Sequence, residues 1–369
     1  MSPRKIVMIA NDTTYVYNLR RELIEELTKR GDRVTVVSEL LLFQKELEEL
    51  QCSLIGVDAQ RHGTNPLSDL KLLLKYIRVL RAIRPDAVLT YNIKPNVYAG
   101  MACRLLNLAY FPNITGLGTA VEYPGKMQKL TTRLYKWGVA KARCVFFQNT
   151  ENEAFFRQRK LLSRRSGTCL LPGSGVNLET HPLLPYPQTE KTHFLFVARV
   201  LKEKGIDQYL AAARALRSQR EDVQFHICGA CDDPAYEQII AQAQAEGTVV
   251  YHGMQKDMQP FFAQASCVVH PSYYPEGMSN VLLEAAACGR PIIAADRSGC
   301  RETVEHGKTG YIVPVQDEQA VVDAVRKFLT LSWEERRDMG LAGRKKMEAE
   351  FDRKIVVAHY TKELDKAQK

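Results

Sequence analysis

The sequence contains no hydrophobic run long enough to cross a membrane. A transmembrane helix needs about 20 consecutive apolar residues, and no stretch of the 369 residues approaches that length. The apolar run nearest the N-terminus, KIVMIA (5–10), is also too short for a secretory signal. We therefore predict a cytoplasmic protein, and any contact with a membrane must be peripheral.

Motifs for metal or redox chemistry are scarce. There is no Asp-x-Asp pair, and Asp232-Asp233 is better explained as a loop. Cys228 and Cys231 have the spacing of a redox pair, but no second pair completes a zinc site. The cysteines number nine, and most lie in apolar runs, which predicts buried free thiols in a reducing compartment. We expect neither a bound metal nor a bound cofactor.

Acidic residues are too few to balance the basic ones, and the imbalance is confined to one half of the chain. The formal charge is +9 overall, +11 for residues 1–185 and −2 for residues 186–369. The first half therefore suits an anionic partner, such as a diphosphate, a membrane surface or a nucleic acid. Because no recognised nucleic-acid motif or series of stacking aromatics is present, we do not expect nucleic acid.

Short β-branched runs alternate with helical patterns, which predicts two tandem Rossmann-like α/β domains, each with a parallel, doubly wound sheet. A segment with three prolines, residues 181–190, interrupts the alternation and is predicted to be a linker. It separates a first domain (1–180) from a second (191–350), and the C-terminal helix (351–369) is expected to pack back on the first. The predicted strands cover residues 5–10, 33–38, 53–57, 87–91, 110–115 and 144–149, then 193–200, 223–229, 248–253, 267–272, 291–296 and 311–315.

Candidate ligand-binding residues follow the predicted strands of the second half. Ligands of such sheets bind beyond the carboxyl ends of the strands. Arg199 and Lys204 lie between a strand and a helix, where two cations can hold a diphosphate, although the segment alone could be a solvated charge run. Gly229 ends the next strand and permits close approach of a ligand to the backbone, which is a weak signal by itself.

Two glutamates eight residues apart give the strongest signal. Glu276 precedes the segment GMSN, and a helix beginning at Ser279 or Asn280 would carry Glu284 about one turn inside it. The helix N-terminus can receive an anion, and the two carboxylates can bind a diol such as ribose from two sides. As an isolated pair, they would equally be a surface acid and a helical salt-bridge partner.

The second half resembles the retaining family 4 of nucleotide-sugar glycosyltransferases, whose fold is GT-B, with two Rossmann-like domains facing across a cleft. The resemblance extends over about 200 residues, in matching order and spacing. It rests on PGSGVNLETH (172–181), ARVLKEKGIDQYL (198–210), VVYHGMQKDMQPFFAQASCVVHPS (249–272), YPEGMSNVLLEAAACGRPII (274–293) and GCRETVEHGKTGYIV (299–313).

The resemblance implies a role for each matching position in binding a nucleotide-sugar donor, most simply a UDP-sugar. Arg199 and Lys204 would bind the diphosphate, Glu284 the ribose, and Glu276 the transferred sugar near its reacting face. The segment around His252 and Gly253 would seat the base, and the residues that follow Glu276 would contact sugar and phosphate. Those residues are Gly277, Met278, Ser279 and Asn280. The family also implies retention of anomeric configuration without a metal.

The first half matches the family less closely. The family's glycine pair after the first strand is absent from ANDTTYVYNL, and Thr115 or Gly116 occupies the position of the family's acceptor-side histidine. YNIKPNVYAGMACR (91–104) and NITGLGTAVEY (113–123) resemble a subgroup that builds bacterial capsule, O-antigen and glycoprotein glycans on polyprenyl diphosphate. Asn92, Lys94 and Asn96 could face that acceptor, with Lys94 meeting its phosphate, although a solvated loop lysine is an equal alternative.

A basic amphipathic segment, GKMQKLTTRLYKWGVAKAR (125–143), suggests an anionic membrane surface as a further partner. Met127, Leu130, Leu134 and Trp137 share one helical face, and Lys126, Lys129, Arg133 and Lys136 share the neighbouring one. A helix that packs its apolar face into the core and exposes its charges is the alternative. We also expect four apolar side chains nearby to contribute to membrane contact: Phe155, Phe156, Leu161 and Leu162.

These observations favour transfer of a hexose, N-acetylhexosamine or hexuronic acid to a polyprenyl-diphosphate-linked saccharide. A transferase with a soluble acceptor is one alternative. A nucleotide-sugar 2-epimerase is another, although the GMSNVLLEA motif argues against it. A third is a binding subunit without activity.

Overall fold

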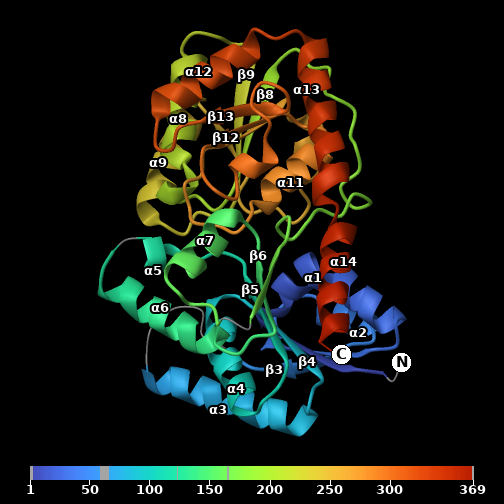
Figure 1. The fold of residues 1–369 in the computed structure, drawn as a ribbon. Helices are drawn as coiled ribbons and strands as arrows, with labels where there is room; N and C mark the ends of the chain where they lie inside the picture. The colour runs from blue at the N-terminus through green and yellow to red at the C-terminus, as the bar shows by residue number, and fades with distance from the viewer. Residues whose placement is uncertain (1–2, 59–65, 123, 164–165, 368–369) are drawn as a thin grey trace. The chain divides into compact units, whose positions relative to one another are not determined.

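The computed structural model describes residues 3–58, 66–122, 124–163 and 166–367, and the chain forms two compact units. The first unit comprises Met1–Ser174, Glu276–Met278 and Arg353–Lys369. The second comprises Gly175–Pro275 and Ser279–Asp352. Both are doubly wound α/β units, as the alternation of strands and helices predicts (Figure 1).

A seven-stranded sheet forms the centre of the first unit, in the order β3-β2-β1-β4-β5-β6-β7, and all its neighbouring strands are parallel. Six of these strands lie where the sequence predicts them. The seventh, β7, was missed because it is a short edge strand, half-exposed and without an apolar run. The strands are β1 (Lys5–Asp12), β2 (Arg33–Glu39), β3 (Ser53–Gly56), β4 (Ala87–Tyr91), β5 (Tyr110–Ile114), β6 (Cys144–Phe147) and β7 (Gly167–Leu170).

Helices cover both faces of this sheet. One face packs against α3, the π-helical turn η1, α4, α6 and α7, and the other against α1, α2 and α14. Because successive strand residues point to opposite faces, Val7 and Ile9 of β1 face the first group, whereas Ile6 and Met8 face the second. The helices are α1 (Thr13–Lys29), α2 (Gln44–Glu49), α3 (Pro66–Ile83), η1 (Pro95–Ala99), α4 (Gly100–Leu105), α5 (Thr119–Glu122), α6 (Lys126–Val139), α7 (Thr150–Gln158) and α14 (Arg353–Lys366).

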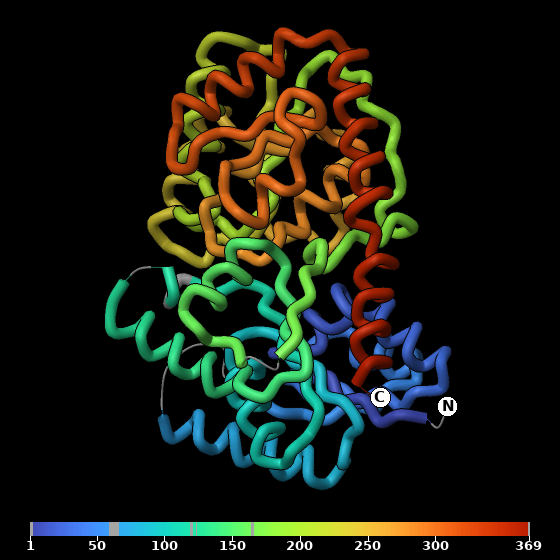
Figure 2. The backbone as a smooth tube through the Cα atoms, in the orientation of Figure 1, coloured from blue at the N-terminus to red at the C-terminus, as the bar shows by residue number. Residues whose placement is uncertain are grey.

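The last helix, α14, returns to the first unit and lies beside α1 (Figure 2). Ion pairs fasten both of its ends. The Arg353 guanidinium lies 3.1 Å from the Glu22 carboxylate, and Arg4 reaches Asp365 at 2.9 Å. Between them, the Tyr360 ring is fully buried against β4 and β6.

The second unit contains a six-stranded parallel sheet, in the order β10-β9-β8-β11-β12-β13. Every strand predicted for this half is present. The strands are β8 (Thr192–Val197), β9 (Val223–Cys228), β10 (Val250–Tyr251), β11 (Cys267–His270), β12 (Ile292–Ala295) and β13 (Gly310–Val313). The helical elements are η2 (Lys202–Lys204), α8 (Ile206–Arg217), α9 (Pro234–Ala245), α10 (Gln259–Gln264), α11 (Asn280–Ala287), η3 (Arg301–Thr303), α12 (Glu318–Leu329), α13 (Trp333–Lys346) and η4 (Met347–Phe351).

The proline-rich segment expected to link the domains is held against the second unit. The buried Arg290 guanidinium donates to the carbonyls of Leu184 and Pro185, at 2.9 and 2.6 Å. Trp333 donates from its indole N–H to the Pro187 carbonyl. The segment is therefore part of the second unit's own packing. Within the described residues, no helix is both long and apolar enough to cross a bilayer.

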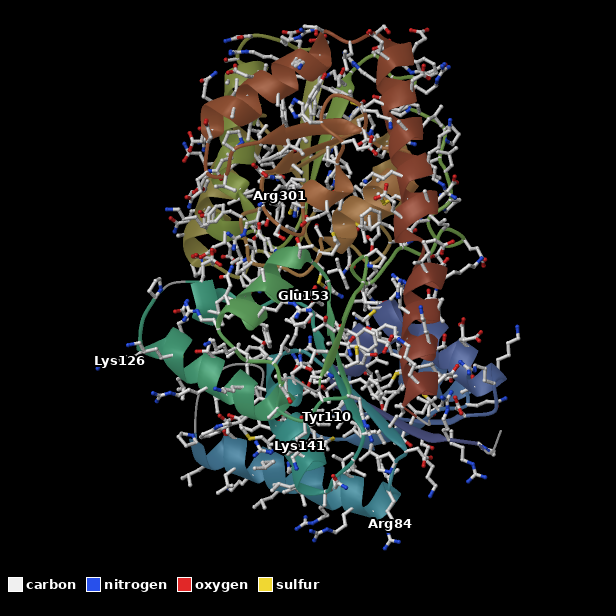
Figure 3. The ribbon with its side chains drawn as sticks, in the orientation of Figure 1. Arg84, Tyr110, Lys126, Lys141, Glu153 and Arg301 are labelled. Atoms are coloured by element: carbon white, nitrogen blue, oxygen red, sulfur yellow. The ribbon has the colours of Figure 1, made fainter. Side chains whose placement is uncertain are left out.

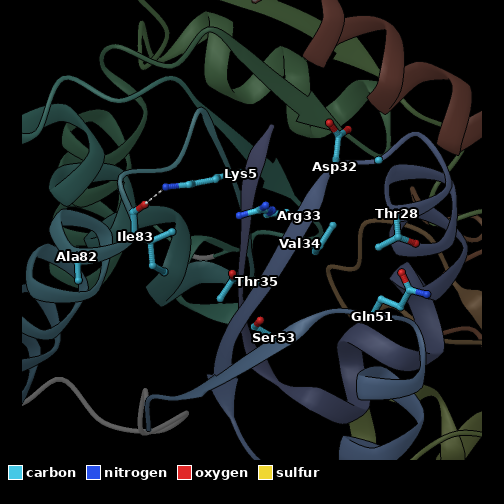
Figure 4. A pocket seen from close by; sticks show the side chains of 11 residues that line it. Lys5, Thr28, Asp32, Arg33, Val34, Thr35, Gln51, Ser53, Ala82 and Ile83 are labelled. Carbon is cyan, nitrogen blue, oxygen red and sulfur yellow. Dashed lines mark hydrogen bonds between the residues drawn. The ribbon is translucent and has the colours of Figure 1, made fainter. Parts of the chain in front are cut away.

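A depression of about 530 Å³ opens at the amino-terminal edge of the first sheet (Figure 4). Lys5, Arg33 and Ser53, which begin three neighbouring strands, help to line it. Ligands of doubly wound sheets bind at the opposite, carboxyl edge. A ligand site is therefore expected at the carboxyl ends of the strands.

Candidate functional site

Arg199 and Lys204 lie in the loop that follows β8, at the carboxyl edge of the second sheet. The Arg199 side chain is exposed, and Lys204 ends the short helix η2. Gly205 follows with φ +80°, and a Cβ there would stand 2.3 Å from the Pro271 carbonyl oxygen. Only glycine allows so close an approach, so the turn that positions Lys204 is held tightly against the loop after β11.

The surroundings of Lys204 disfavour its positive charge. Burial lowers the pKa of its ammonium to about 8, the Cys300 thiol opposes the shift, and the Arg199 guanidinium adds to it. The ammonium lies 4.6 Å from the centre of the Tyr274 ring, a cation–π contact. A cation held in partly dry surroundings binds a diphosphate more strongly than one in water.

Gly229, His252 and Gly253, which the sequence predicts to contact the donor, meet at the ends of β9 and β10. The Gly229 N–H donates to the Gly253 carbonyl at 2.8 Å, and the Tyr251 hydroxyl donates to the Gly229 carbonyl at 2.9 Å. Gly229 has φ +151°, and a Cβ there would stand 1.7 Å from the Ala198 carbonyl oxygen. Its missing side chain is therefore what lets β9 end against the loop that carries Arg199.

Helix α11 begins at Asn280, as predicted, just beyond the carboxyl end of β11. Ser279 is its N-cap residue and is buried, and its hydroxyl lies 3.4 Å from Nε2 of His270. Burial lowers the pKa of His270 to about 3, so this imidazole is neutral. The buried Oδ1 of Asn280 has no hydrogen-bond partner, and it can accept a hydrogen bond from a sugar hydroxyl. Glu284 is half-buried in the second turn of the helix.

Glu276, Gly277 and Met278 belong to the first unit, unlike the residues on either side of them. The Gly277 N–H donates to the Thr115 carbonyl at 3.1 Å. The Asn149 amide donates to the carbonyls of Glu276 and Gly277, at 3.2 and 2.7 Å. A Cβ on Gly277 would stand 2.7 Å from the Thr115 carbonyl oxygen, a backbone atom, so this position requires glycine.

Of the predicted acceptor residues, Asn92 and Asn96 hold the local fold. Asn92 has φ +68°, and its Oδ1 accepts from the Asn11 N–H, which joins the carboxyl ends of β4 and β1. Asn96 is 1% exposed; its amide donates to the Asn113 carbonyl and its Oδ1 accepts from Thr90. The expectation that Asn96 faces an acceptor is therefore wrong, because its side chain is buried and fully paired.

The remaining acceptor candidates, Lys94, Thr115 and Gly116, are half-buried beyond the ends of β4 and β5. Lys94 is not the solvated lysine of the alternative interpretation, since its ammonium lies 3.2 Å from the Asp69 carboxylate. The other Asp69 oxygen accepts from the Tyr98 hydroxyl at 2.8 Å. Lys94 is thus held in place by α3 and η1, just beyond the carboxyl end of β4.

Helix α6 exposes its apolar row. Met127, Leu130 and Trp137 are 48%, 46% and 56% exposed, and Leu134 is half-buried against the core. The side chains that face the sheet are mostly polar or small, namely Gln128, Thr131, Thr132, Tyr135, Gly138 and Val139. The core-packing interpretation of the apolar row is therefore wrong. Lys126, Lys129, Arg133 and Lys136 are exposed beside it, and Figure 3 shows Lys126 projecting from the start of the helix.

The four apolar residues expected to extend this membrane surface do not do so. Phe156 is fully buried and Leu161 is 4% exposed, while Phe155 and Leu162 pack on the core. An amphipathic periodicity fits either a membrane-facing or a core-facing surface, and here these four side chains pack into the core. The nine cysteines are free thiols, and seven of them are buried, as their apolar runs predict. Asp233 caps α9, and within the described residues no group of three or more potential ligands could hold a metal ion.

Three histidines form a hydrogen-bonded chain across the second sheet, a feature the sequence reasoning missed. Nδ1 of His193 lies 2.9 Å from Nε2 of His226, and Nδ1 of His226 lies 2.9 Å from Nε2 of His252. The rings stack, and the His252 ring meets Phe261 edge-on. Burial lowers the pKa of His226 to about 4, helped by both neighbours, and the pKa values of His193 and His252 are also lowered.

Acidification should therefore destabilise the second unit. The unfolded chain, with histidine pKa values near 6.5, binds more protons than the folded chain between about pH 4 and pH 6.5. The contribution of the histidines to the free energy of unfolding is complete above that range and is lost as the pH falls through it. Urea unfolding at about pH 7.5 and about pH 5 measures this loss, which should be smaller in His226→Gln. An equal loss in the two proteins would contradict the role of the histidine chain.

Other residues of the candidate site left only weak signals in the sequence. Gln148 and Asn149 directly follow β6, and polar residues at a strand end could have suggested them. His226 and His270 lie inside strands, and nothing in the periodicity separates them from ordinary core residues. Their contacts come from strands that are distant in the sequence.

Comparison with known proteins also indicates a glycosyltransferase. Residues 186–346 match the family model "Glycosyl transferases group 1", and residues 5–149 match "Glycosyl transferase 4-like". The chain is 25% identical, over 99% of each chain, to the N,N'-diacetylbacillosaminyl-diphospho-undecaprenol alpha-1,3-N-acetylgalactosaminyltransferase of Campylobacter jejuni. It is 25% identical to the capsular polysaccharide biosynthesis glycosyltransferase CapM of Staphylococcus aureus, over 92% of this chain and 91% of CapM.

Solved structures share the fold. A glycosyltransferase from Rickettsia africae superposes with a TM-score of 0.80 at 16% identity, over 100% of each chain. HepE of Anabaena, solved in complex with UDP, superposes with a TM-score of 0.77 at 17% identity, over 98% of this chain and 100% of HepE. The chain therefore belongs to the GT-B glycosyltransferases, with a glycosyl transferase 4-like domain followed by a group 1 glycosyl transferase domain.

Proposed function

We propose that this glycosyltransferase moves a hexose, N-acetylhexosamine or hexuronic acid from a UDP-sugar to a saccharide carried on polyprenyl diphosphate. The reaction retains the anomeric configuration, requires no metal, and serves the synthesis of a bacterial surface polysaccharide or glycoprotein glycan. The enzyme works at the cytoplasmic face of the inner membrane. The Campylobacter relative, which matches over its whole length, supports this acceptor class.

The observation that carries the proposal is the arrangement at the carboxyl edge of the second sheet. Lys204 and Arg199 follow β8, and the N-terminus of α11 follows the adjacent strand β11. Two cations and a helix N-terminus suit a diphosphate that gains charge as it leaves. In the proposed step, the bond between the sugar's anomeric carbon and the phosphate oxygen breaks. The acceptor oxygen bonds to that carbon from the same side, and its proton passes to the departing phosphate.

In this proposal, the acceptor is bound by Lys94, Thr115 and Gly116. In the proposed complex, an acceptor phosphate takes over part of the contact that Lys94 now makes with Asp69. Polyprenyl diphosphate resides in a bilayer, and the exposed apolar and basic rows of α6 suit an anionic lipid surface.

The test is nucleotide release from a panel of UDP- and GDP-sugars, with and without a short-chain polyprenyl-diphosphate-sugar acceptor. We expect acceptor-dependent UDP release, lowered at least about 10²-fold in Glu276→Ala because a contact to the reacting sugar is lost. Glu221→Ala, at an exposed glutamate that precedes β9, is the control and should react normally. A chelator should leave the rate unchanged.

The other outcomes separate the alternatives. Release that requires a water-soluble saccharide would replace the lipid acceptor by a soluble one. Acceptor-independent formation of free sugar or an epimer would indicate a nucleotide-sugar 2-epimerase. If no donor reacts with any acceptor, the chain acts as a binding subunit and the proposal fails.

A further inference from the structure

Helix α3 is apolar on two sides. Leu72, Tyr76 and Leu80 face the sheet and are at most 4% exposed. On the outward side, Leu67, Leu70 and Leu74 are 71%, 52% and 55% exposed, and their spacing of three and four residues places them in one row. A helix that only covers a sheet has no use for this second row.

Neighbouring helices also expose large hydrophobic side chains. α3 packs against η1 and α4, which in turn pack against α6, all on one face of the first sheet. Of the fifteen large hydrophobic side chains that are exposed within the described chain, seven belong to the three helices α3, α4 and α6. We call these seven side chains the platform: Leu67, Leu70, Leu74, Leu105, Met127, Leu130 and Trp137. Single exposed leucines are normal, but a gathering of this kind marks an interaction surface.

The charges around this surface have one sign. The exposed ionisable side chains of the three helices are all basic, namely Lys71, Lys75, Arg78, Arg81, Arg104, Lys126, Lys129, Arg133 and Lys136. The one acidic residue of these fully described helices is Asp69, which is half-buried and paired with Lys94. Arg84, just past α3, projects outward as well (Figure 3). On the opposite face, α1, α2 and α14 carry charges of both signs.

We propose that α3 is a second bilayer-contacting helix, which lies with α4 and α6 on an anionic lipid surface. Protein interfaces are depleted in lysine, whereas a bilayer surface accepts leucine and tryptophan among its acyl chains and pairs lysine with anionic headgroups. The composition of the platform therefore selects a membrane over a protein partner. The proposal extends the membrane location proposed above, and adds a helix that the periodicity of α6 does not imply.

The side of α3 that faces the sheet connects this surface to the proposed acceptor site. Asp69 is one residue from Leu70 and holds Lys94 at 3.2 Å, just beyond the end of β4. The helix that touches lipid on one side thus holds the proposed phosphate-binding lysine on the other. An acceptor whose diphosphate sits at the membrane surface would meet Lys94 without leaving the lipid.

Vesicle flotation of the full chain tests the proposal, with neutral phosphatidylcholine vesicles and vesicles that contain about a third phosphatidylglycerol. The wild type should bind the anionic vesicles more tightly, and less so at high salt. Lys71→Gln with Lys75→Gln should weaken that binding roughly 25-fold, since each surface lysine contributes about fivefold. Leu70→Ser with Leu74→Ser should weaken binding as strongly as Leu130→Ser with Trp137→Ser.

Leu41→Ser with Leu42→Ser is the matched control, because these exposed leucines lie in the loop after β2 that is bonded to Thr13, at the start of α1, and should not matter. Circular dichroism and nucleotide release with a water-soluble short-chain acceptor report whether the α3 variants are folded, and both should be unchanged. Normal vesicle binding by both α3 variants, with loss only in the α6 variant, would overturn the role of α3 while leaving the proposed function intact. A concentration-dependent dimer abolished by Leu70→Ser with Leu74→Ser, without an effect on vesicles, would assign the surface to a second copy and overturn it also.

Discussion

Replacing Lys204 by alanine should lower kcat by about 10²- to 10³-fold, the range seen when a group that stabilises developing charge is removed. The ammonium lies in surroundings dry enough to bring its pKa to about 8. It therefore acts on the departing diphosphate with little screening. Rapid-quench measurement of a single turnover, at saturating donor and acceptor, isolates the chemical step.

The lowered pKa makes a second, more specific prediction for the same residue. Only the protonated ammonium binds the diphosphate, so kcat/KM of the wild type should fall as the pH rises through about 8. In the donor complex the diphosphate raises the pKa, and kcat should fall only at higher pH. Lys204→Arg keeps its charge over this range, so the alkaline fall of kcat/KM should disappear in that variant, whatever its absolute rate.

Variants at Lys202 and Arg199 show whether the loss is specific to the two cations of the proposed site. Lys202 is exposed on the same short helix, two residues earlier, and Lys202→Ala should react as the wild type does. Arg199→Ala should lose turnover in the same manner as Lys204→Ala. Near-normal turnover in both Arg199→Ala and Lys204→Ala would refute the proposed role of the two cations.

Gly229→Ala should destabilise the second unit by about 3 kcal/mol or more and abolish donor binding. The backbone of Gly229 has φ +151°, and the added methyl carbon would stand 1.7 Å from the Ala198 carbonyl oxygen. Neither partner can give way cheaply, because the Ala198 N–H is bonded to the Cys228 carbonyl and the Gly229 N–H to Gly253. Urea unfolding followed by circular dichroism, with UDP binding by calorimetry, measures both effects.

Gly247→Ala is the matched control. Gly247 has φ +70° in the same unit, but no atom lies within 4 Å of the place where its Cβ would stand. This change adds conformational strain without a collision and should cost only about 1 kcal/mol. If the two variants lost equal stability, strain would account for both, and the close approach at Gly229 would have no special importance.

The sequence predicted most of the fold, because the evidence for it is local. A buried parallel strand needs a short apolar run, and twelve such runs were visible, from KIVMIA at 5–10 to YIVPV at 311–315. The edge strand β7 (Gly167–Leu170) was missed because it is half-exposed and has no such run. The start of α11 at Asn280 could be predicted because GMSN is a loop followed by an apolar helical segment.

The candidate site was predicted where its residues lie beside one another in the chain, and less well where they meet through the fold. Asn96 and Lys94 follow β4 alike, but only the packing of β4, β5 and η1 buries Asn96 between Thr90 and Asn113. Phe156 and Leu130 both belong to amphipathic helices, yet one is fully buried and the other 46% exposed. Periodicity shows that a helix has an apolar face and says nothing of what covers it.

By itself, the sequence determined the two α/β units, the order of their strands along the chain, and the glycosyltransferase family. Strand propensity, helix caps and spaced motifs all act over a few residues. Only the tertiary structure decided which glycines are irreplaceable, which histidines join, and which side of α3 and α6 is left uncovered. These properties depend on atoms brought together from distant segments, such as His193 and His226 or Gly229 and Ala198. The lowered pKa values of the histidines depend in the same way on burial by those segments.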